Sequence, residues 1–512
     1  MKNYLNKPAL LSYNTVWRWH FYAGLFCIPF IILLSITGAI YLFKPQYEAF
    51  QNSDYNNLPV TNVVAGKVGI SNLSATENAK SAKLQVLAAL AAVADSDFNA
   101  YQLPQTAQAA AQIMLVKNGD LYRVFVNPFN LQVLKIERED DKLMTYIHHL
   151  HGQLLLGDRG SNIVELAASW AIVMIITGLF LWWPRNLNSL AGILYPRLAS
   201  SIVIRNGQQV KSRLFWRDLH AVIGFWVSFL TLFLLISGLP WAKSWGGILK
   251  ELRNVNSTMQ VKTPQDWTIG RASELEARQL IKPAKVKIAP IAMTEDEHAQ
   301  HQAMQHKHAH QVPTANFNAL DNMAENKSLN QMVENVKALH LAYPVLVAAP
   351  LKRSPNWTAK SDAQNRPLRV NLELDANTGN ILSRKNFADR GLLDRIIGFG
   401  ISIHEGQLFG WLNQLLWLLT ALSLITVSVS GVVMWWRRRR GMDVSTNTLG
   451  APIKAPRNDV RTPFGILTLV FTFAILLPFL GLSLFMILAF EYWILPRLPK
   501  AANFLGVTIK PS

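Results

Sequence analysis

The chain has 512 residues, half of them hydrophobic, a formal charge of +18 and a single cysteine. Its mean hydropathy of +0.16 is too high for an ordinary soluble enzyme of this charge. One cysteine excludes a disulfide framework, and Cys27 lies inside an apolar run, where thiol chemistry is not expected. The basic residues flank apolar runs, which indicates a membrane protein with positive-inside topology and excludes a nucleic-acid surface.

The first apolar span runs from about Phe21 to Phe43 and follows three basic residues. Because the run is long and no small-residue cleavage site follows it, we interpret it as a retained helix and not a signal peptide. Further spans follow near 157–183, 222–241, 411–436 and 464–487, each long enough to cross a bilayer of about 30 Å.

The distribution of charge orients these spans. Segments 1–20, 184–217 and 437–461 hold three, six and seven Lys or Arg against none, none and two acidic residues. Segment 45–150 is nearly balanced, with ten acidic and eight basic residues. We therefore expect a bacterial inner-membrane protein with the three basic segments in the cytoplasm, the two long segments in the periplasm and the C-terminus in the periplasm.

The predicted fold class is a mainly α-helical membrane protein with five transmembrane helices and two periplasmic α+β domains. In chain order the predicted segments are the cytoplasmic N-terminus with the first span (1–44), the first periplasmic domain (45–150), the second span with a preceding His segment (151–184), a basic cytoplasmic loop (185–217), the third span (218–243), the second periplasmic domain with a His-rich insert (244–403), the fourth span (404–440), a cytoplasmic loop (441–462), the fifth span (463–490) and the periplasmic C-terminus (491–512).

Parts of the chain recur at fixed offsets. At an offset of 200 the pairs are His20 with His220, Gly24 with Gly224 and Gly38 with Gly238. At an offset of 253 they are His151 with His404, Gly157 with Gly410, Gly178 with Gly431, Trp182 with Trp435 and Trp183 with Trp436. These matches predict an internal duplication of a helix–domain–helix unit, with the fifth span unpaired.

The two periplasmic segments end alike. Strand-like runs at 121–126 and 369–374 each lead through a turn, at 127–130 and 375–380, into a second strand. A helix is predicted from Ser328 to Leu341, before the second hairpin. The stretch 262–324 has little periodicity and reads as a linker or mobile insert, and its histidines between His298 and His310 give only a weak indication of metal capture.

Four histidines recur between the halves: His20, His220, His151 and His404. Such residues at a membrane edge either anchor helix ends or carry function, because an unpaired polar group there is costly. If the halves are related by an axis along the membrane normal, His20 faces His220 near the cytoplasmic side and His151 faces His404 near the periplasmic side. Facing imidazoles between apolar helices suit the axial ligands of b-type haem, so two haem b groups are expected.

Several alternatives to this assignment stay open. Gly24 and Gly224 lie one turn from their histidines and either admit a porphyrin or serve close helix packing. His148 and His149 are alternative ligands beside His151. Zinc also binds imidazole, but a structural zinc site needs four ligands at one depth. Straight helices would set the two haem sites some 30 Å apart, so the segments 151–157 and 404–410 are expected to dip into the membrane.

Four motifs stand out along the chain: Trp17-Arg18-Trp19-His20, His151-Gly152-Gln153-Leu154, the HEGQLFG string at 404–410, and Ser430-Gly431 with Trp435-Trp436. In these motifs the sequence resembles the PepSY-associated transmembrane family of iron-regulated inner-membrane proteins, which includes ferrisiderophore reductases. The strand–turn–strand pattern at the end of each periplasmic segment is similar to that of PepSY domains. The chain departs from the family pattern in its His-rich insert and in Phe129-Asn130-Leu131, where a Thr-Gly turn is usual.

The resemblance implies a haem-dependent ferric-chelate reductase. Electrons from a cytoplasmic flavoprotein or quinol would reach a periplasmic ferric chelate or siderophore and release Fe(II), with no residue acting as acid or base. No dinucleotide-binding or Walker motif is visible, so the electrons must come from a partner. The alternatives are a non-enzymatic PepSY protein that binds or regulates a periplasmic partner, and an iron-uptake accessory protein.

Overall fold

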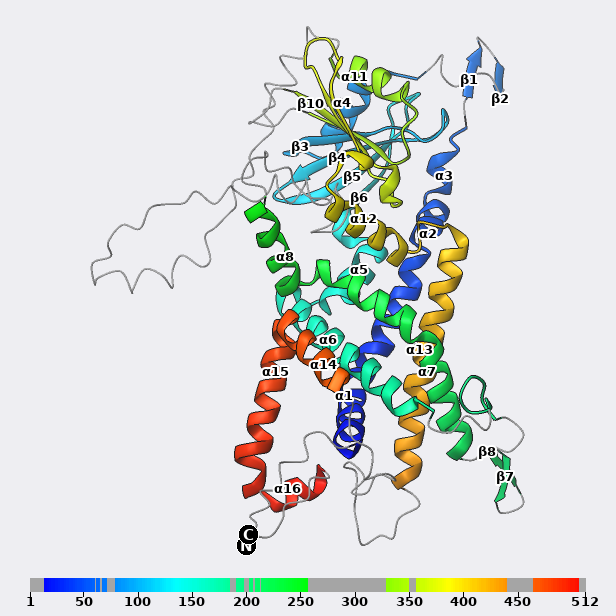
Figure 1. The fold of residues 1–512 in the computed structure, drawn as a ribbon. Helices are drawn as coiled ribbons and strands as arrows, with labels where there is room; N and C mark the ends of the chain where they lie inside the picture. Colours follow the sequence, from blue (N-terminus) through cyan, green and yellow to red (C-terminus); the bar gives the residue numbers. More distant parts are fainter. Residues whose placement is uncertain are drawn as a thin grey trace, which may run out of the picture. The chain divides into compact units, whose positions relative to one another are not determined.

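The computed structural model describes residues 13–59, 61–64, 67–70, 79–184, 190–197, 202–205, 208–211, 213–256, 328–349, 356–439 and 464–505. The chain divides into two compact units (Figure 1). The membrane unit comprises Met1–Leu42, Ile147–Lys262 and Phe409–Ser512, and the sheet unit comprises Phe43–Tyr146 and Thr263–Leu408. The predicted His-rich insert lies outside the described residues.

Four long helices form a ring in the membrane unit. They are α1 (Tyr13–Leu42), α6 (Gly157–Trp182), α7 (Arg213–Gly238) and α13 (Trp411–Arg439). Helix α1 packs against α6 and α13, and α7 packs against the same two helices. Consequently α1 and α7 lie diagonally across the bundle. All four are long and apolar enough to cross a membrane, as predicted.

The fifth predicted span is broken. Helix α14 (Phe464–Leu476) ends at Leu477, and α15 (Pro478–Ala489) starts with a proline, which has no N–H to continue the helix. The fifth candidate span among the described residues is Pro478–Arg497, continued past α15 by a π-turn (η7, Phe490–Ile494) and a 3₁₀ turn (η8, Leu495–Arg497). A fifth candidate span is therefore present as predicted, but it covers 478–497 and not 464–487.

Helix α15 runs back toward the end of the bundle where α1 begins. Arg18 near that end of α1 forms an ion pair with Glu491 at 3.0 Å. The Tyr22 hydroxyl donates a hydrogen bond to the carbonyl of Phe504, the last residue of the short helix α16 (Pro499–Phe504). The described part of the C-terminal segment therefore lies beside the start of α1, whereas the sequence predicted it on the opposite side of the membrane from residues 1–20. Figure 1 shows α15 and α16 at this end of the unit.

A buried carboxylate organises the exit from α7. After the short turn η3 (Leu239–Trp241), helix α8 (Lys243–Asn256) begins against α6. Glu165 of α6, which is 1% exposed, accepts hydrogen bonds from the backbone N–H groups of Ser244 and Trp245 at 3.0 and 3.2 Å. A carboxylate satisfies the otherwise unpaired N–H groups at a helix start and suits the helix dipole. Glu165 therefore caps α8 from a neighbouring span.

The sheet unit contains one eight-stranded antiparallel sheet in the order β12-β11-β10-β9-β3-β4-β5-β6. Its strands are β3 (Asp97–Gln102), β4 (Ala111–Lys117), β5 (Asp120–Val126), β6 (Val133–Arg138), β9 (Val345–Ala348), β10 (Trp357–Ser361), β11 (Val370–Leu374) and β12 (Ile381–Asn386). The two predicted α+β segments each supply four strands. They join edge to edge where β3 pairs with β9, with Tyr101 opposite Val347.

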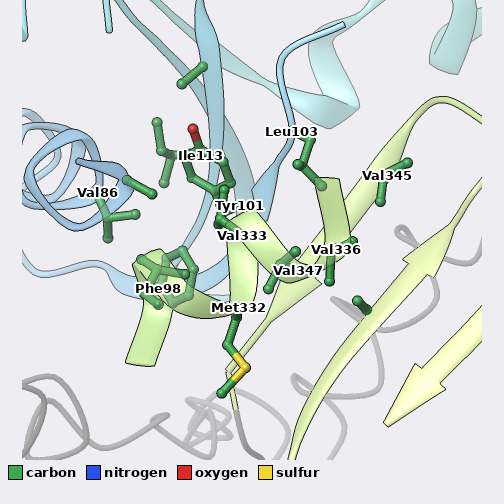
Figure 2. Packing of buried hydrophobic residues seen from close by; sticks show 14 of the residues in the cluster. Val86, Phe98, Tyr101, Leu103, Ile113, Met332, Val333, Val336, Val345 and Val347 are labelled. Carbon is green, nitrogen blue, oxygen red and sulfur yellow. The ribbon is translucent and has the colours of Figure 1, made fainter. Parts of the chain in front are cut away.

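The two halves of the sheet also share one hydrophobic core. Helices α4 (Ala82–Ala92) and α11 (Ser328–Lys337) pack together, and alternate strand residues point toward them. Figure 2 shows Val86 of α4 and Met332 of α11 among buried residues of β3, β4 and β9. Joining the halves removes two open strand edges and gives a larger core than either four-stranded half has alone.

The remaining elements are short. The first half is entered through α2 (Lys44–Gln51) and α3 (Ser53–Asn56) and carries a hairpin of β1 (Thr61–Val64) and β2 (Lys67–Ile70). Strands β7 (Ile202–Arg205) and β8 (Gln208–Lys211) pair in the basic loop of the membrane unit. The sheet halves end in the turns η1 (Glu139–Asp141) and η6 (Phe387–Asp389), each followed by a helix with a recurring histidine, α5 (Leu143–Gln153) and α12 (Leu392–His404).

The predicted hairpin turns are confirmed, and they share one conformation. The N–H of Leu131 bonds to the Asn127 carbonyl, and that of Gly379 bonds to the Asp375 carbonyl, both at 2.9 Å. Leu131 and Gly379 have positive φ values of 64° and 70°. The departure from the usual Thr-Gly turn thus places a leucine in a left-handed conformation that costs about 1–2 kcal/mol in a residue with a Cβ.

Candidate functional site

Two of the recurring histidines meet inside the helix bundle. His20 of α1 and His220 of α7 face each other across the ring of helices, with their ring centres 6.4 Å apart and their planes at 87°. Because α1 and α7 lie diagonally, neither helix blocks the space between the two imidazoles. We call these two residues the inner pair.

Each histidine of the inner pair is held from behind by the next helix. Nδ1 of His20 lies 3.1 Å from the Met174 carbonyl and 3.2 Å from the Thr177 hydroxyl, both on α6. A carbonyl oxygen can only accept a hydrogen bond, so Nδ1 carries the proton. In the neutral tautomer that results, Nε2 keeps its lone pair.

His220 makes the corresponding contacts with α13. Its Nδ1 lies 3.0 Å from the Val427 carbonyl and 3.2 Å from the Ser430 hydroxyl. Val427 and Ser430 stand 253 positions after the two partners of His20. Both imidazoles of the inner pair therefore present a basic Nε2, and an apolar bundle disfavours a charged imidazolium.

This geometry fits a metal centre bound by two imidazoles. A metal–imidazole bond is about 2 Å long, so two imidazoles on opposite sides of one ion have ring centres about 6 Å apart. Two lone pairs cannot hydrogen-bond to each other, and a shared electrophile between them removes their repulsion. Haem iron suits such a pair because the porphyrin supplies its other four ligands. Backbone carbonyls behind ligating histidines are the usual second layer of such sites.

The glycines near the inner pair divide into two kinds. A Cβ on Gly178 would lie 3.0 Å from Cε1 of His20, and one on Gly431 would lie 3.6 Å from Cε1 of His220. In contrast, a Cβ on Gly24 would meet only Met174 Sδ at 3.8 Å, and one on Gly224 would meet no described atom within 4 Å. Close helix packing therefore does not require Gly24 or Gly224, which leaves space beside the histidines.

The other two recurring histidines fall in different units. His151 lies in the last turn of α5 in the membrane unit, and its Nδ1 lies 2.9 Å from the Thr37 hydroxyl of α1. His148 lies against Tyr41 with ring centres 5.5 Å apart, and His149 adjoins His148. His404 is the last residue of α12 in the sheet unit. The pairing of His151 with His404 stays a prediction.

A three-ligand metal site is not found in the part of the chain that the structure describes, where no three His, Cys, Asp or Glu side chains are placed to share an ion. The sheet unit instead contains a buried ion-pair network. Glu139 accepts hydrogen bonds from Arg123 and from Lys142, the latter at 2.7 Å. Burial opposes the ionisation of Glu139, but the attraction and hydrogen bonds of these two cations outweigh it and lower the pKa of the carboxyl.

Sequence reasoning missed the groups that hold the histidines. Thr177 and Gly178, and likewise Ser430 and Gly431, follow no motif of metal ligands, and only the glycines had been noted as recurring. The signal that could have found them is a hydroxyl residue before each of these glycines. Glu165 was missed as well, although an acidic residue within a span is a signal by itself.

Comparison with known proteins identifies the class of this membrane protein. The sequence matches the family described as the PepSY-associated TM region over residues 17–438. The match covers most of the chain, so the protein belongs to this family, as the resemblance indicated. A search of curated proteins finds no match.

Proposed function

We propose that this chain is a di-haem b protein of the bacterial inner membrane that reduces periplasmic ferric chelates, among them ferrisiderophores. The observation that carries the proposal is the inner pair. Two imidazoles, each with Nδ1 bonded to a helix carbonyl, face each other at 6.4 Å inside an apolar bundle. Two basic ring nitrogens in an apolar bundle are costly unless they bind something between them.

In this proposal His20 and His220 hold one haem, and His151 and His404 hold the second. A bound haem supplies one-electron redox chemistry, and the protein supplies ligation, orientation and the exclusion of water. The donor is a cytoplasmic flavoprotein or a quinol, and the acceptor is Fe(III) in a periplasmic chelate. Hard oxygen chelators bind Fe(II) far more weakly than Fe(III), so reduction releases the iron.

The two halves of the chain, in this proposal, arose by duplication, with the sheet unit in the periplasm. The three basic segments support a cytoplasmic N-terminus. Glu491 and Phe504 contact Arg18 and Tyr22 near the start of α1, which supports a cytoplasmic C-terminal segment in place of the periplasmic one expected from five straight spans.

The spacing of the histidine contacts along α1 supports electron transfer between two sites. His151 contacts Thr37, which follows His20 by 17 residues on the same helix. At 1.5 Å per residue these levels are about 25 Å apart. This is shorter than the separation of some 30 Å expected for straight helices, because the contact lies one turn inside the end of α1. The width of two porphyrins shortens the gap further.

The test uses proteoliposomes with a reductant sealed inside and a ferric chelate outside. Wild-type protein should show a b-type visible spectrum and should reduce the external iron. His404→Ala should stop external reduction while the inner haem stays bound and reducible from inside. A matched control is His340→Asn, which changes an exposed histidine outside both pairs at a position with φ of 48° that asparagine accepts. A colourless wild-type protein, or a His404→Ala protein as active as wild type, would refute the mechanism.

A further inference from the structure

Each helix of the four-helix ring contains one hydroxyl residue followed by glycine within an apolar stretch. The four pairs are Thr37-Gly38 on α1, Thr177-Gly178 on α6, Ser237-Gly238 on α7 and Ser430-Gly431 on α13. Three of them contact a recurring histidine. Thr177-Gly178 contacts His20, Ser430-Gly431 contacts His220, and Thr37-Gly38 contacts His151.

The glycine makes room for the imidazole ring most clearly at Gly178 and Gly38, where an added Cβ would lie 3.0 Å from Cε1 of His20 and 3.3 Å from Cε1 of His151. In an α-helix the N–H of residue i+4 bonds to the carbonyl of residue i, so the side chain at i+4 lies close to that carbonyl. Gly178 and Gly431 stand four residues after Met174 and Val427, the two carbonyl acceptors. A Cβ on Gly178 would lie 3.0 Å from the ring of His20, a distance at which the imidazole would have to move away from the helix.

The hydroxyl in the three pairs that contact a histidine favours the same tautomer as the backbone carbonyls beside His20 and His220, with the proton on Nδ1. Thr177 donates its hydrogen to the Val173 carbonyl at 2.8 Å, Ser430 to the Val427 carbonyl at 2.7 Å, and Thr37 to the Leu33 carbonyl at 2.8 Å. The hydroxyl oxygen then offers only lone pairs to the histidine. It accepts a hydrogen bond from Nδ1, which keeps the proton on Nδ1 and leaves Nε2 as the ligand atom.

We propose that three of these hydroxyl–glycine pairs, Thr177-Gly178, Ser430-Gly431 and Thr37-Gly38, are seats that fix the tautomer and position of His20, His220 and His151. The internal resemblance supports this role, because moving the contact of His20 with Thr177 by 200 and 253 positions gives the observed contact of His220 with Ser430.

The first experiment measures the inner haem and therefore rests on the proposed function. Thr177→Val and Ser430→Ala should each shift the midpoint potential and the EPR g-values of the inner haem, and should speed its loss by roughly 10- to 100-fold. The matched control is Thr420→Val on α13. Thr420 is 1% exposed and donates to the Leu416 carbonyl, as the seat hydroxyls do to theirs, but contacts no histidine among the described residues. Unchanged potential, g-values and haem loss in both seat variants would overturn the role of the hydroxyl.

The glycines are tested in the same preparation. Gly178→Ala should lower inner-haem occupancy, because its Cβ would lie only 3.0 Å from Cε1 of His20 and would push the ring away from the helix. Gly465→Ala on α14 is the control, since a Cβ there meets no described atom within 4 Å. Full occupancy and an unchanged spectrum in Gly178→Ala would show that the ring does not need this space.

The two proposals fail in different ways. Absence of haem in wild-type protein would refute the proposed function, whereas haem that is bound equally well and with the same spectrum in the seat variants would refute only the role of the seats.

Discussion

The most decisive prediction concerns the inner pair, because its two residues should hold one haem and not two. The ring centres of His20 and His220 are 6.4 Å apart, against about 6 Å for two imidazoles on opposite sides of one metal ion. Replacing either residue removes one of the two axial ligands of the same iron. We expect His20→Ala and His220→Ala each to lower the haem content from about two per chain to about one.

The double variant distinguishes one shared haem from two separate haems. The effects of substituting two residues that bind the same group do not add. The double variant His20→Ala with His220→Ala should therefore also keep about one haem per chain. The haem that remains should have the same spectrum and midpoint potential in all three variants. The assay is pyridine haemochrome quantification per mole of protein, together with low-temperature EPR.

Two results would refute this reasoning. If the double variant loses both haems while each single variant loses one, the two histidines serve different haems. If the single variants lose haems with different spectra, the pairing crosses the two halves in another way. His340→Asn, the exposed control, should keep the wild-type haem content.

Four other expectations follow from the structure. Deletion of 298–310 should leave haem content and chelate reduction within error, and a large fall in reduction would show that this tract captures metal or docks substrate. Glu165→Gln should lower the unfolding free energy of the membrane unit by about 1–2 kcal/mol, since neutral hydrogen bonds replace charge-assisted ones at the start of α8; an unchanged stability in detergent titration would argue against the cap. The pKa of Glu139 is lowered in the folded protein, so its ion pairs stabilise the fold fully above about pH 4.5. This stabilisation is lost as the pH falls below that value, and Glu139→Gln should therefore make the unfolding free energy depend less steeply on pH in the acid range. Leu131→Gly should stabilise its hairpin by about 1 kcal/mol and Gly379→Ala should destabilise the other by at least as much, as measured by hydrogen exchange of the turn amides; equal effects of the same sign would contradict the left-handed turn.

The resemblance between the two halves explains why the site was partly visible in the sequence. Recurrence at 200 positions singled out His20 and His220, and recurrence at 253 positions singled out His151 and His404, from twelve histidines. Hydropathy placed both of them near the same end of their spans. The sequence could not show that α1 and α7 lie diagonally, which is what allows the two rings to face each other.

Other features escaped sequence reasoning because they depend on contacts distant in the chain. The joining of β3 with β9 brings together residues about 250 positions apart, and strand patterns alone do not say which edges pair. The return of α15 follows from the break at Pro478 together with the ion pair of Glu491 with Arg18. Apolar composition over 464–487 is the same for a straight helix and for a broken one.

The sequence by itself determined the membrane class, four of the five spans, the two sheet hairpins and the four recurring histidines. These features depend on local properties, namely hydropathy over about 20 residues, alternation over a strand and identity at a fixed offset. The tertiary structure alone decided that His20 faces His220 and that Thr177-Gly178 and Ser430-Gly431 hold the two rings. A hydrogen bond from Nδ1 to a carbonyl on another helix fixes the tautomer of a histidine, and no local pattern of residues contains that contact.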